Sequence, residues 1–170
     1  MAAFRDYLSQ LDDCIRRQCW YPALALALAL PDICASLEGI KGNYEQRVTT
    51  WLERNQKYLA LGADVIYAAR CSFLHNGSGI LGDGQKPKGR IVLLAPPGDG
   101  THSHNVKADG TKLGEYHVEV DDLVRCMLNA AGPWADAHEA LLKDSEASGR
   151  LLAILPNPGS TWGHAAELGA

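Results

Sequence analysis

Arg70 and His75, five positions apart, have the side-chain chemistries that cleave a phosphodiester bond in RNA without a metal ion. Such cleavage needs a base that takes the proton of the ribose 2′-hydroxyl, an acid that protonates the leaving 5′-oxygen, and a positive charge beside the phosphate. Histidine changes its charge near neutral pH and can serve as the base or the acid. Arginine stays protonated, and its planar guanidinium can hold two phosphate oxygens. One chain has one such pair, so a two-fold dimer would bring two histidines and two arginines to one cleft.

The same pair also fits a structural role, in which Arg70 is buried against a carboxylate and His75 caps its own helix. On a helix the two side chains are separated by roughly 140° around the axis. They do not share one stripe, but a long arginine and a histidine at the helix end can reach one pocket. Both interpretations stay open on the residue types alone.

Polar side chains near this pair are candidate contacts for a nucleotide. Ser72 and Asn76 could hydrogen-bond a nucleotide or orient His75, although Ser72 can equally bond its own helix backbone. Tyr67, one turn before Arg70, fits the core better than a platform for base stacking. The glycine-rich loop that follows carries three basic residues, which fit either phosphate contacts or a solvated loop: Lys86, Lys88 and Arg90.

Three histidines suggest a different kind of site, a zinc centre. His102 and His104 would face one way in a strand, and His117 lies on the expected partner strand. No cysteine or acidic residue has a metal-like spacing beside them. We therefore favour exposed polar residues on a hairpin, and we expect neither a metal nor a cofactor.

The first two helices are predicted from their apolar patterns. Residues 2–19 have apolar side chains at helical spacing, with charged ones mostly on the other side. Pro22 suits the first position of a second helix. Its alternating Leu–Ala run, residues 23–30, is called helical because alanine is poor in strands. Gly39 ends this second helix, and Pro31 is expected to kink or divide it.

The next two helices have clear start and stop signals. Asn43 can cap a third helix, with Gln46 three residues on in the capping-box position. Gly62 is expected to end this helix. The helix that carries the Arg–His pair follows, and Gly77 suits the left-handed position that ends it.

A small antiparallel β insert is expected at about residues 90–120. Ile91 begins one strand, and a segment at 101–107 is expected to turn at Asp109-Gly110 and pair with 112–120. The fold class is therefore mainly α, a helical bundle with a small antiparallel β insert.

The C-terminal part is expected to return to helix. Asp121 or Asp122 starts a helix, and Gly132-Pro133 restarts the helical pattern. Residues 1–145 are expected to form one domain, and residues 146–170 an extension with a mostly small-residue end.

Composition indicates an ordinary globular protein. Of 170 residues, 46% are hydrophobic and 21% are charged, and the net charge of −4 provides no general attraction to nucleic acid. The five cysteines are odd in number and scattered, which favours reduced thiols in a cytoplasm. The run at 23–30 is too short to span a bilayer, and we expect no membrane association.

The segment Tyr67-Ala-Ala-Arg-Cys-Ser-Phe-Leu-His-Asn-Gly77 resembles the HEPN superfamily, in its plasmid-borne, defence-associated branch. The resemblance covers residues 1–145 in helix order, and its specific content lies in residues 67–77. It implies a homodimer whose motif helices meet at the interface, acting on RNA as a metal-independent endoribonuclease of toxin type. The expected product has a 2′,3′-cyclic phosphate, and an antitoxin or other regulatory protein is a possible partner.

The sequence departs from one branch of this family. Some members have a tyrosine two residues after the motif histidine, which a partner nucleotidyltransferase modifies, whereas Gly77 stands at that position here. That form of antitoxin control is not expected. The alternative function is a non-catalytic HEPN-like module that binds nucleotides or a protein.

Overall fold

Six α-helices and one small sheet form the part of the chain that the computed structural model describes, residues 2–59, 61–81, 89–94 and 114–151. A short 3₁₀ turn, Gln56–Tyr58, follows the third helix. The helices are α1 Ala2–Arg16, α2 Trp20–Glu38, α3 Tyr44–Arg54, α4 Ala63–Asn76, α5 Val120–Ala137 and α6 Glu139–Ala147; the strands are β1 Ile80–Leu81, β2 Gly89–Leu94 and β3 Gly114–Glu119. The prediction of a mainly α fold with a small β insert is confirmed.

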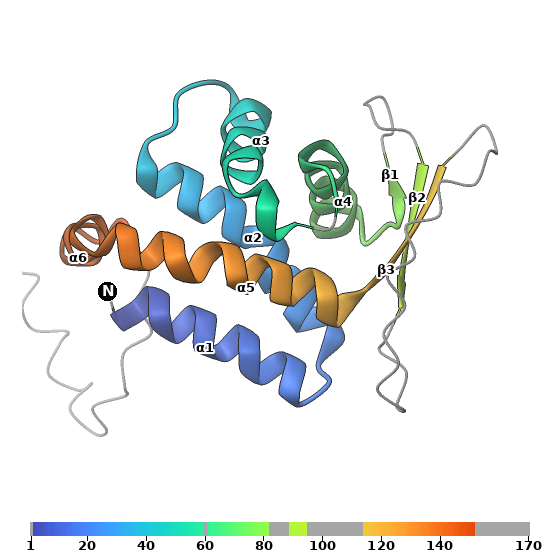
Figure 1. The fold of residues 1–170 in the computed structure, drawn as a ribbon, viewed down its shortest axis with the longest axis horizontal. Coiled ribbons are helices and arrows are strands. Elements are labelled where there is room, and N and C mark those ends of the chain that lie inside the picture. The colour runs from blue at the N-terminus through green and yellow to red at the C-terminus, as the bar shows by residue number, and fades with distance from the viewer. Residues whose placement is uncertain (1, 60, 82–88, 95–113, 152–170) are drawn as a thin grey trace, which may run out of the picture.

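Helix α2 forms the centre of the bundle, because it contacts each of the other five α-helices. Figure 1 shows the helices gathered on one side and the sheet at the end where α4 finishes and α5 begins. The buried residues of α2 include Ala27, Leu28 and Leu30. Small alanines alternate with leucines along this helix, which lets neighbouring helices approach it on several sides.

The apolar composition of α2 is also sufficient for a membrane span. Among the described helices it alone is long and apolar enough to cross a bilayer, and half of its most apolar stretch is buried inside the bundle. The helix begins at Trp20, ends at Glu38 before Gly39 as predicted, and is continuous through Pro31. Division at Pro31 is therefore wrong. A proline removes one backbone hydrogen bond, and burial of the helix against five neighbours outweighs that loss.

Helix α5 is likewise continuous, so the predicted restart at Gly132-Pro133 is wrong. Buried residues on both sides of Pro133, including Ala130 and Trp134, hold the helix in place. The Trp134 ring lies 5.5 Å from the ring of Phe4 on α1, measured between centroids. Helix packing again overrides the local break.

The capping box at the start of α3 is confirmed. The Gln46 backbone N–H donates to Asn43 Oδ1 at 2.9 Å, and the Asn43 backbone N–H donates to Gln46 Oε1 at 3.0 Å. The predicted end at Gly62 is wrong, because α3 finishes at Arg54 and Gly62 precedes α4. The Asn55 side chain donates to the Trp51 carbonyl at 2.9 Å, a local bond that competes with continuation of the helix.

The end of α4 is as predicted. Gly77 has φ of 60° in the left-handed region, and its N–H donates to the Phe73 carbonyl at 2.9 Å. The Ser78 N–H then donates to the Ser72 carbonyl at 3.0 Å. The bond from Gly77 to Phe73 is that of the αL motif, and it ends the helix ahead of β1.

The sheet is mixed rather than wholly antiparallel. β1 pairs with β2 in antiparallel fashion, as expected for the insert, but β2 pairs with β3 in parallel, with Ile91 opposite Tyr116. A parallel pair needs a crossover of a dozen or more residues, and residues 95–113 supply that length. The expected strand at 101–107 and turn at Asp109-Gly110 lie outside the described residues.

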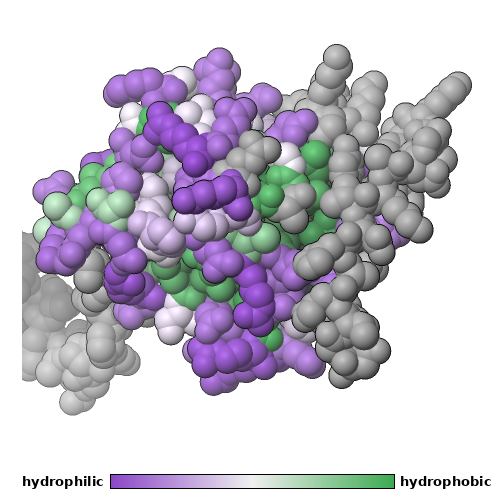
Figure 2. All heavy atoms as spheres, in the orientation of Figure 1, coloured by the Kyte–Doolittle hydropathy of each residue, from purple (hydrophilic) through white to green (hydrophobic). Residues whose placement is uncertain are grey.

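The insert also begins earlier than expected, at Ile80. Leu81, Ile91 and Val118 are buried and join the core. In Figure 2 the face in view is mostly hydrophilic, with apolar atoms showing over α4 and between α1 and α5. The sheet therefore extends the hydrophobic core at the end of α4, the helix that carries the Arg–His pair.

Candidate functional site

The structure brings Arg70 and His75 into contact within one chain. Nη1 of Arg70 lies 3.1 Å from Nε2 of His75, although the two residues project from different sides of α4. A guanidinium can only donate hydrogen bonds, so Nε2 is the acceptor. This contact therefore requires a neutral imidazole with its proton on Nδ1. His75 is exposed, whereas the Arg70 side chain is only 13% exposed.

Asp32 of α2 is the carboxylate beside Arg70. Its Oδ2 lies 3.6 Å from Nη2 of Arg70, which is an ion pair but longer than a good hydrogen bond. The structural role considered for Arg70 is thus partly present. Sequence reasoning missed Asp32, yet a signal existed: it is the only charged residue between Arg17 and Glu38, in an otherwise apolar helix.

Tyr44 forms the floor beneath Arg70. The guanidinium carbon of Arg70 lies 4.7 Å from the centre of the Tyr44 ring, and that of Arg47 lies 5.9 Å from it. The capping box places Tyr44 at the first position of α3 and Arg47 one turn later. Burial and then Asp32 raise the pKa of Tyr44, whereas Arg70 opposes that shift. Neither Tyr44 nor Arg47 was predicted, because only the packing of α3 on α4 brings them here.

Hydrogen-bond donors are in excess at this site. In the described part of the chain several buried side-chain polar atoms have no hydrogen-bond partner, and two of them are guanidinium nitrogens of this site, Arg47 Nε and Arg70 Nε. Such groups are costly unless something pairs with them, typically about 1–3 kcal/mol each. The Nε–Nη2 edge of Arg70 has only the long ion pair with Asp32. This is the edge of arginine that can bind an oxyanion with two parallel bonds.

Tyr67 is a core residue, as the sequence suggested. It is 8% exposed, and its ring lies 6.1 Å from that of Tyr44. Burial, followed by a hydrogen bond with Cys71, raises the pKa of Tyr67 to about 12. Glu45, exposed on α3, also contributes to that increase. Tyr67 therefore stays neutral and supports the floor of the site.

Ser72 has a structural role that differs from both sequence interpretations. Its buried hydroxyl donates to the Ile80 carbonyl at 2.7 Å, so it fastens α4 to β1 instead of bonding a nucleotide or its own helix. Asn76, the last residue of α4, is exposed next to His75 in the chain. Asn76 thus remains a candidate contact, and Ser72 does not.

The basic loop is only partly described. Arg90 is exposed on β2, where it stands opposite Ile80 in the antiparallel pair. Since Ser72 bonds Ile80, Arg90 belongs to the part of the sheet that joins the end of α4. Lys86 and Lys88 lie outside the described residues.

The histidine cluster considered for zinc is also largely outside them. His102 and His104 lie outside the described residues, whereas His117 lies on β3 opposite Val92 of β2. Within the described ranges, no group of three histidine, cysteine, aspartate or glutamate side chains is placed to hold a metal ion.

The site therefore combines a largely buried guanidinium whose Nε has no hydrogen-bond partner, an exposed imidazole and an aromatic floor. Its parts come from α2, α3 and α4, and sequence motifs alone identify only the α4 members. Comparison with protein-family models, curated proteins and solved structures finds no match to this chain, so the candidate site is interpreted from its own geometry.

Proposed function

We propose that this protein is a metal-independent endoribonuclease that works as a homodimer, in a toxin or defence role in the cytoplasm. The observation that carries the proposal is the 3.1 Å contact between Arg70 Nη1 and His75 Nε2. It joins a permanent cation to a neutral imidazole, and these are the charge stabiliser and the base that RNA cleavage needs.

In the proposed reaction the hydrogen bond between Arg70 Nη1 and His75 Nε2 opens, and Nε2 then takes the proton of a ribose 2′-hydroxyl. The 2′-oxygen attacks the adjacent phosphorus, the bond to the 5′-oxygen breaks, and a 2′,3′-cyclic phosphate forms. The leaving 5′-oxygen needs a proton, which the protonated imidazolium of His75 in a second copy would supply across a two-fold axis, so the two copies would act in different protonation states. Arg70 would hold phosphate oxygens through Nη2 and, once the side chains that cover it move aside, through Nε.

Phosphate binding would have to displace Asp32 from Arg70. The 3.6 Å separation between their charged atoms makes this pair weaker than a close bidentate one, and the Asp32 side chain is 32% exposed. In the absence of RNA, Asp32 and Tyr44 would hold the guanidinium in place. The negative charge of Asp32 would also keep the site from binding anions indiscriminately.

A second candidate is a non-catalytic HEPN-like module that binds nucleotides or a protein partner. The observation that favours it is the low exposure of Arg70, 13%, beside Asp32 and over the ring of Tyr44. An arginine held in this way could serve mainly to join α2, α3 and α4. The net charge of −4 also fits a module with little general affinity for RNA.

The deciding experiment measures RNA cleavage by the full chain with excess chelator present. His75→Ala and Arg70→Lys should each lower the rate about 10²–10⁴-fold while the circular dichroism spectrum stays native. Arg70→Lys keeps the charge but loses the bidentate edge. The matched control is His138→Gln, because His138 stacks on Trp134 at 4.8 Å between ring centroids, at the other end of α5.

RNA with a 2′-deoxyribose at the cleaved position should resist the enzyme, since that oxygen is the nucleophile. Equal cleavage by wild type and His75→Ala would refute the proposed role of His75. A folded dimer that cleaves no RNA in either form would favour the binding module. A regulatory partner, such as an antitoxin, is part of the toxin proposal and would be sought by co-purification.

A further inference from the structure

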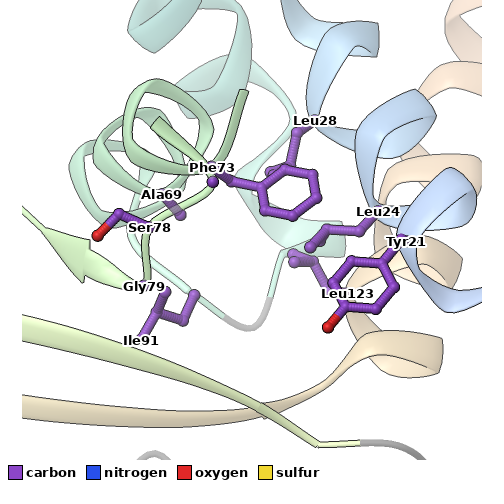
Figure 3. Close-up of a pocket in the computed structure, with 10 residues that line it drawn as sticks. Tyr21, Leu24, Leu28, Ala69, Phe73, Ser78, Gly79, Ile91 and Leu123 are labelled. Carbon is purple, nitrogen blue, oxygen red and sulfur yellow. The ribbon is translucent and has the colours of Figure 1, made fainter. Parts of the chain in front are cut away.

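A small apolar pocket lies beside the candidate site, between α2, α4, β2 and the start of α5. Its volume is about 160 Å³. Figure 3 shows side chains from α2 and α4 converging on it, with Ile91 of β2 on one side. The residues that matter for its chemistry are two aromatic rings, the aliphatic side chains around them and a glycine-rich turn: Tyr21, Phe73, Leu24, Leu28, Ile91 and residues 77–79.

The size of the pocket matches one six-membered ring. An apolar protein cavity of about 150 Å³ is large enough to bind benzene. A pyrimidine base is a single ring of that size, whereas a purine has a second fused ring that would remain outside. The volume therefore matches a single-ring base more closely than a fused two-ring base.

The aromatic wall is suited to base stacking. Tyr21 is 76% exposed, which is unusual for a large aromatic side chain, and its ring is nearly parallel to that of Phe73, at 13° and 6.5 Å between centroids. In Figure 3 the two rings stand next to each other at the pocket, with Leu24 close by. Flat aromatic surfaces of this kind bind unpaired bases of RNA by stacking.

Helices α2 and α4 link the pocket to the Arg70 site. Phe73 is one turn after Arg70 on α4, and Leu28 is one turn before Asp32 on α2. The two helices thus carry the Asp32–Arg70 pair in one turn and residues that line the pocket in an adjacent turn. Phe73 lies roughly 4.5 Å from Arg70 along the axis of α4, so the near wall of the pocket is within one helical turn of the arginine.

Several polar groups of the turn at 77–79 are engaged in hydrogen bonds within the protein. The Gly77 and Ser78 N–H groups bond carbonyls of α4, the Ser78 hydroxyl accepts from the Ile80 N–H at 3.0 Å, and the Gly79 carbonyl accepts from the Ile91 N–H at 2.8 Å. Few directional groups remain to read the edge of a base. Because few directional groups remain, we expect the pocket to select a base by the size of its ring and not to distinguish cytosine from uracil.

We propose that this pocket binds a pyrimidine base of RNA next to the phosphate held by Arg70, accepting cytosine and uracil alike. The inference rests on the proposed function, since it assigns a base subsite to the same substrate. It makes Tyr21 and Phe73 binding residues and makes single-stranded, pyrimidine-containing RNA the preferred substrate.

Calorimetry with the full chain tests the pocket without any cleavage step. The probes are uridine, cytidine and adenosine 3′-monophosphates, with inorganic phosphate as the reference. Both pyrimidine nucleotides should bind with similar affinity and more tightly than the adenosine nucleotide and phosphate. Tyr21→Ala should weaken pyrimidine nucleotide binding about 5- to 150-fold, the loss expected for one base stack, and leave phosphate binding unchanged.

The matched control is Ile80→Ala. Ile80 is the other large apolar residue that is strongly exposed in the described part of the chain, at 66%, and it does not line the pocket. Because Tyr21 is so exposed, its replacement is not expected to prevent folding. Equal binding of adenosine and uridine nucleotides, or indifference to Tyr21→Ala, would overturn the proposed subsite.

Cleavage assays separate this inference from the proposed function. RNA cleavage that depends on His75 but is equal on oligouridine and oligoadenosine would keep the ribonuclease and overturn the pyrimidine pocket. Selective pyrimidine nucleotide binding with no RNA cleavage would keep the pocket and overturn the ribonuclease.

Discussion

At the scale of single residues, the state of His75 follows from its neighbour. Arg70 offers only donors, so the Nη1–Nε2 distance of 3.1 Å assigns the lone pair of His75 to Nε2. The partner of one ring nitrogen decides which nitrogen carries the proton. An imidazole of this tautomer already presents a basic nitrogen toward the cation that would hold a phosphate.

This assignment predicts the nitrogen NMR spectrum of His75. At a pH where the imidazole is neutral, Nδ1 should be protonated and Nε2 should not. Arg70→Met should remove the constraint and increase the share of the Nε2–H form, while His138, whose Nδ1 lies 2.8 Å from the Trp134 carbonyl, should not change. An Nε2–H signal from His75 in the wild type would contradict the Arg70 contact.

At the scale of elements, the C-terminus of α4 depends on one backbone conformation. Gly77 and Gly132 both have open space around the position where a Cβ would stand, but Gly77 has φ of +60° and Gly132 lies inside α5. The effects of alanine at these two positions on stability should therefore differ only through the backbone conformation that each position requires. The pair isolates the cost of the left-handed turn that follows His75.

Opposite changes in the free energy of unfolding are expected. Gly77→Ala should destabilise the protein by about 1 kcal/mol, because a Cβ disfavours the left-handed region. Gly132→Ala should stabilise it by about 0.5–1 kcal/mol, because glycine is a poor helix residue. Urea unfolding measures both, and destabilisation by Gly132→Ala would contradict the continuous α5.

The contact between α1 and α2 carries a titratable hydrogen bond. The Tyr7 hydroxyl donates to the Leu26 carbonyl at 2.8 Å. Burial, followed by the effect of Cys34, raises the pKa of Tyr7 from 10.0 to about 12. In the unfolded chain Tyr7 would ionise near its ordinary pKa, whereas in the folded protein it stays neutral.

The free energy of unfolding should therefore decrease as the pH rises from about 10 to about 12, since the unfolded state binds fewer protons there. Tyr7→Phe should make this decrease smaller, because phenylalanine cannot ionise. Urea unfolding at several alkaline pH values measures the slope. An equal slope in both proteins would show that Tyr7 does not contribute.

At the scale of the whole molecule, the charge distribution and the single Arg–His pair point to assembly. A chain with a net charge of −4 has no general attraction to RNA, so recognition has to be local. The candidate site of one chain has one imidazole, that of His75, while the proposed reaction uses one imidazole as the base and another as the acid. The second imidazole is expected from a second copy whose α4 lies near the first.

Analytical ultracentrifugation at micromolar concentration should give twice the chain mass of 18.4 kDa. In such a dimer, adding excess His75→Ala chains to wild-type chains should lower RNA cleavage per wild-type chain, because each mixed dimer has only one His75 imidazole for a reaction that uses two. A monomer, or a dimer with the two His75 residues on opposite outer faces, would contradict the proposed acid–base pair.

Local signals made several elements predictable from the sequence. The capping box of Asn43 and Gln46 and the left-handed Gly77 involve residues within one turn of each other, so their chemistry is visible in a short window. Helical periodicity likewise identified α1 and the helix with Arg70. Proline misled at positions 31 and 133, because its local cost was outweighed by burial against neighbouring helices.

The site itself needed the tertiary structure. The sequence by itself determined a mainly helical chain and the Arg70–His75 pair at the end of one helix. Asp32, Tyr44 and Arg47 joined that pair only through the packing of α2 and α3 on α4. The parallel pairing of β2 with β3 was decided in the same way. Contacts between distant segments depend on which apolar faces are buried together, and that choice is made by the whole core rather than by any short stretch of chain.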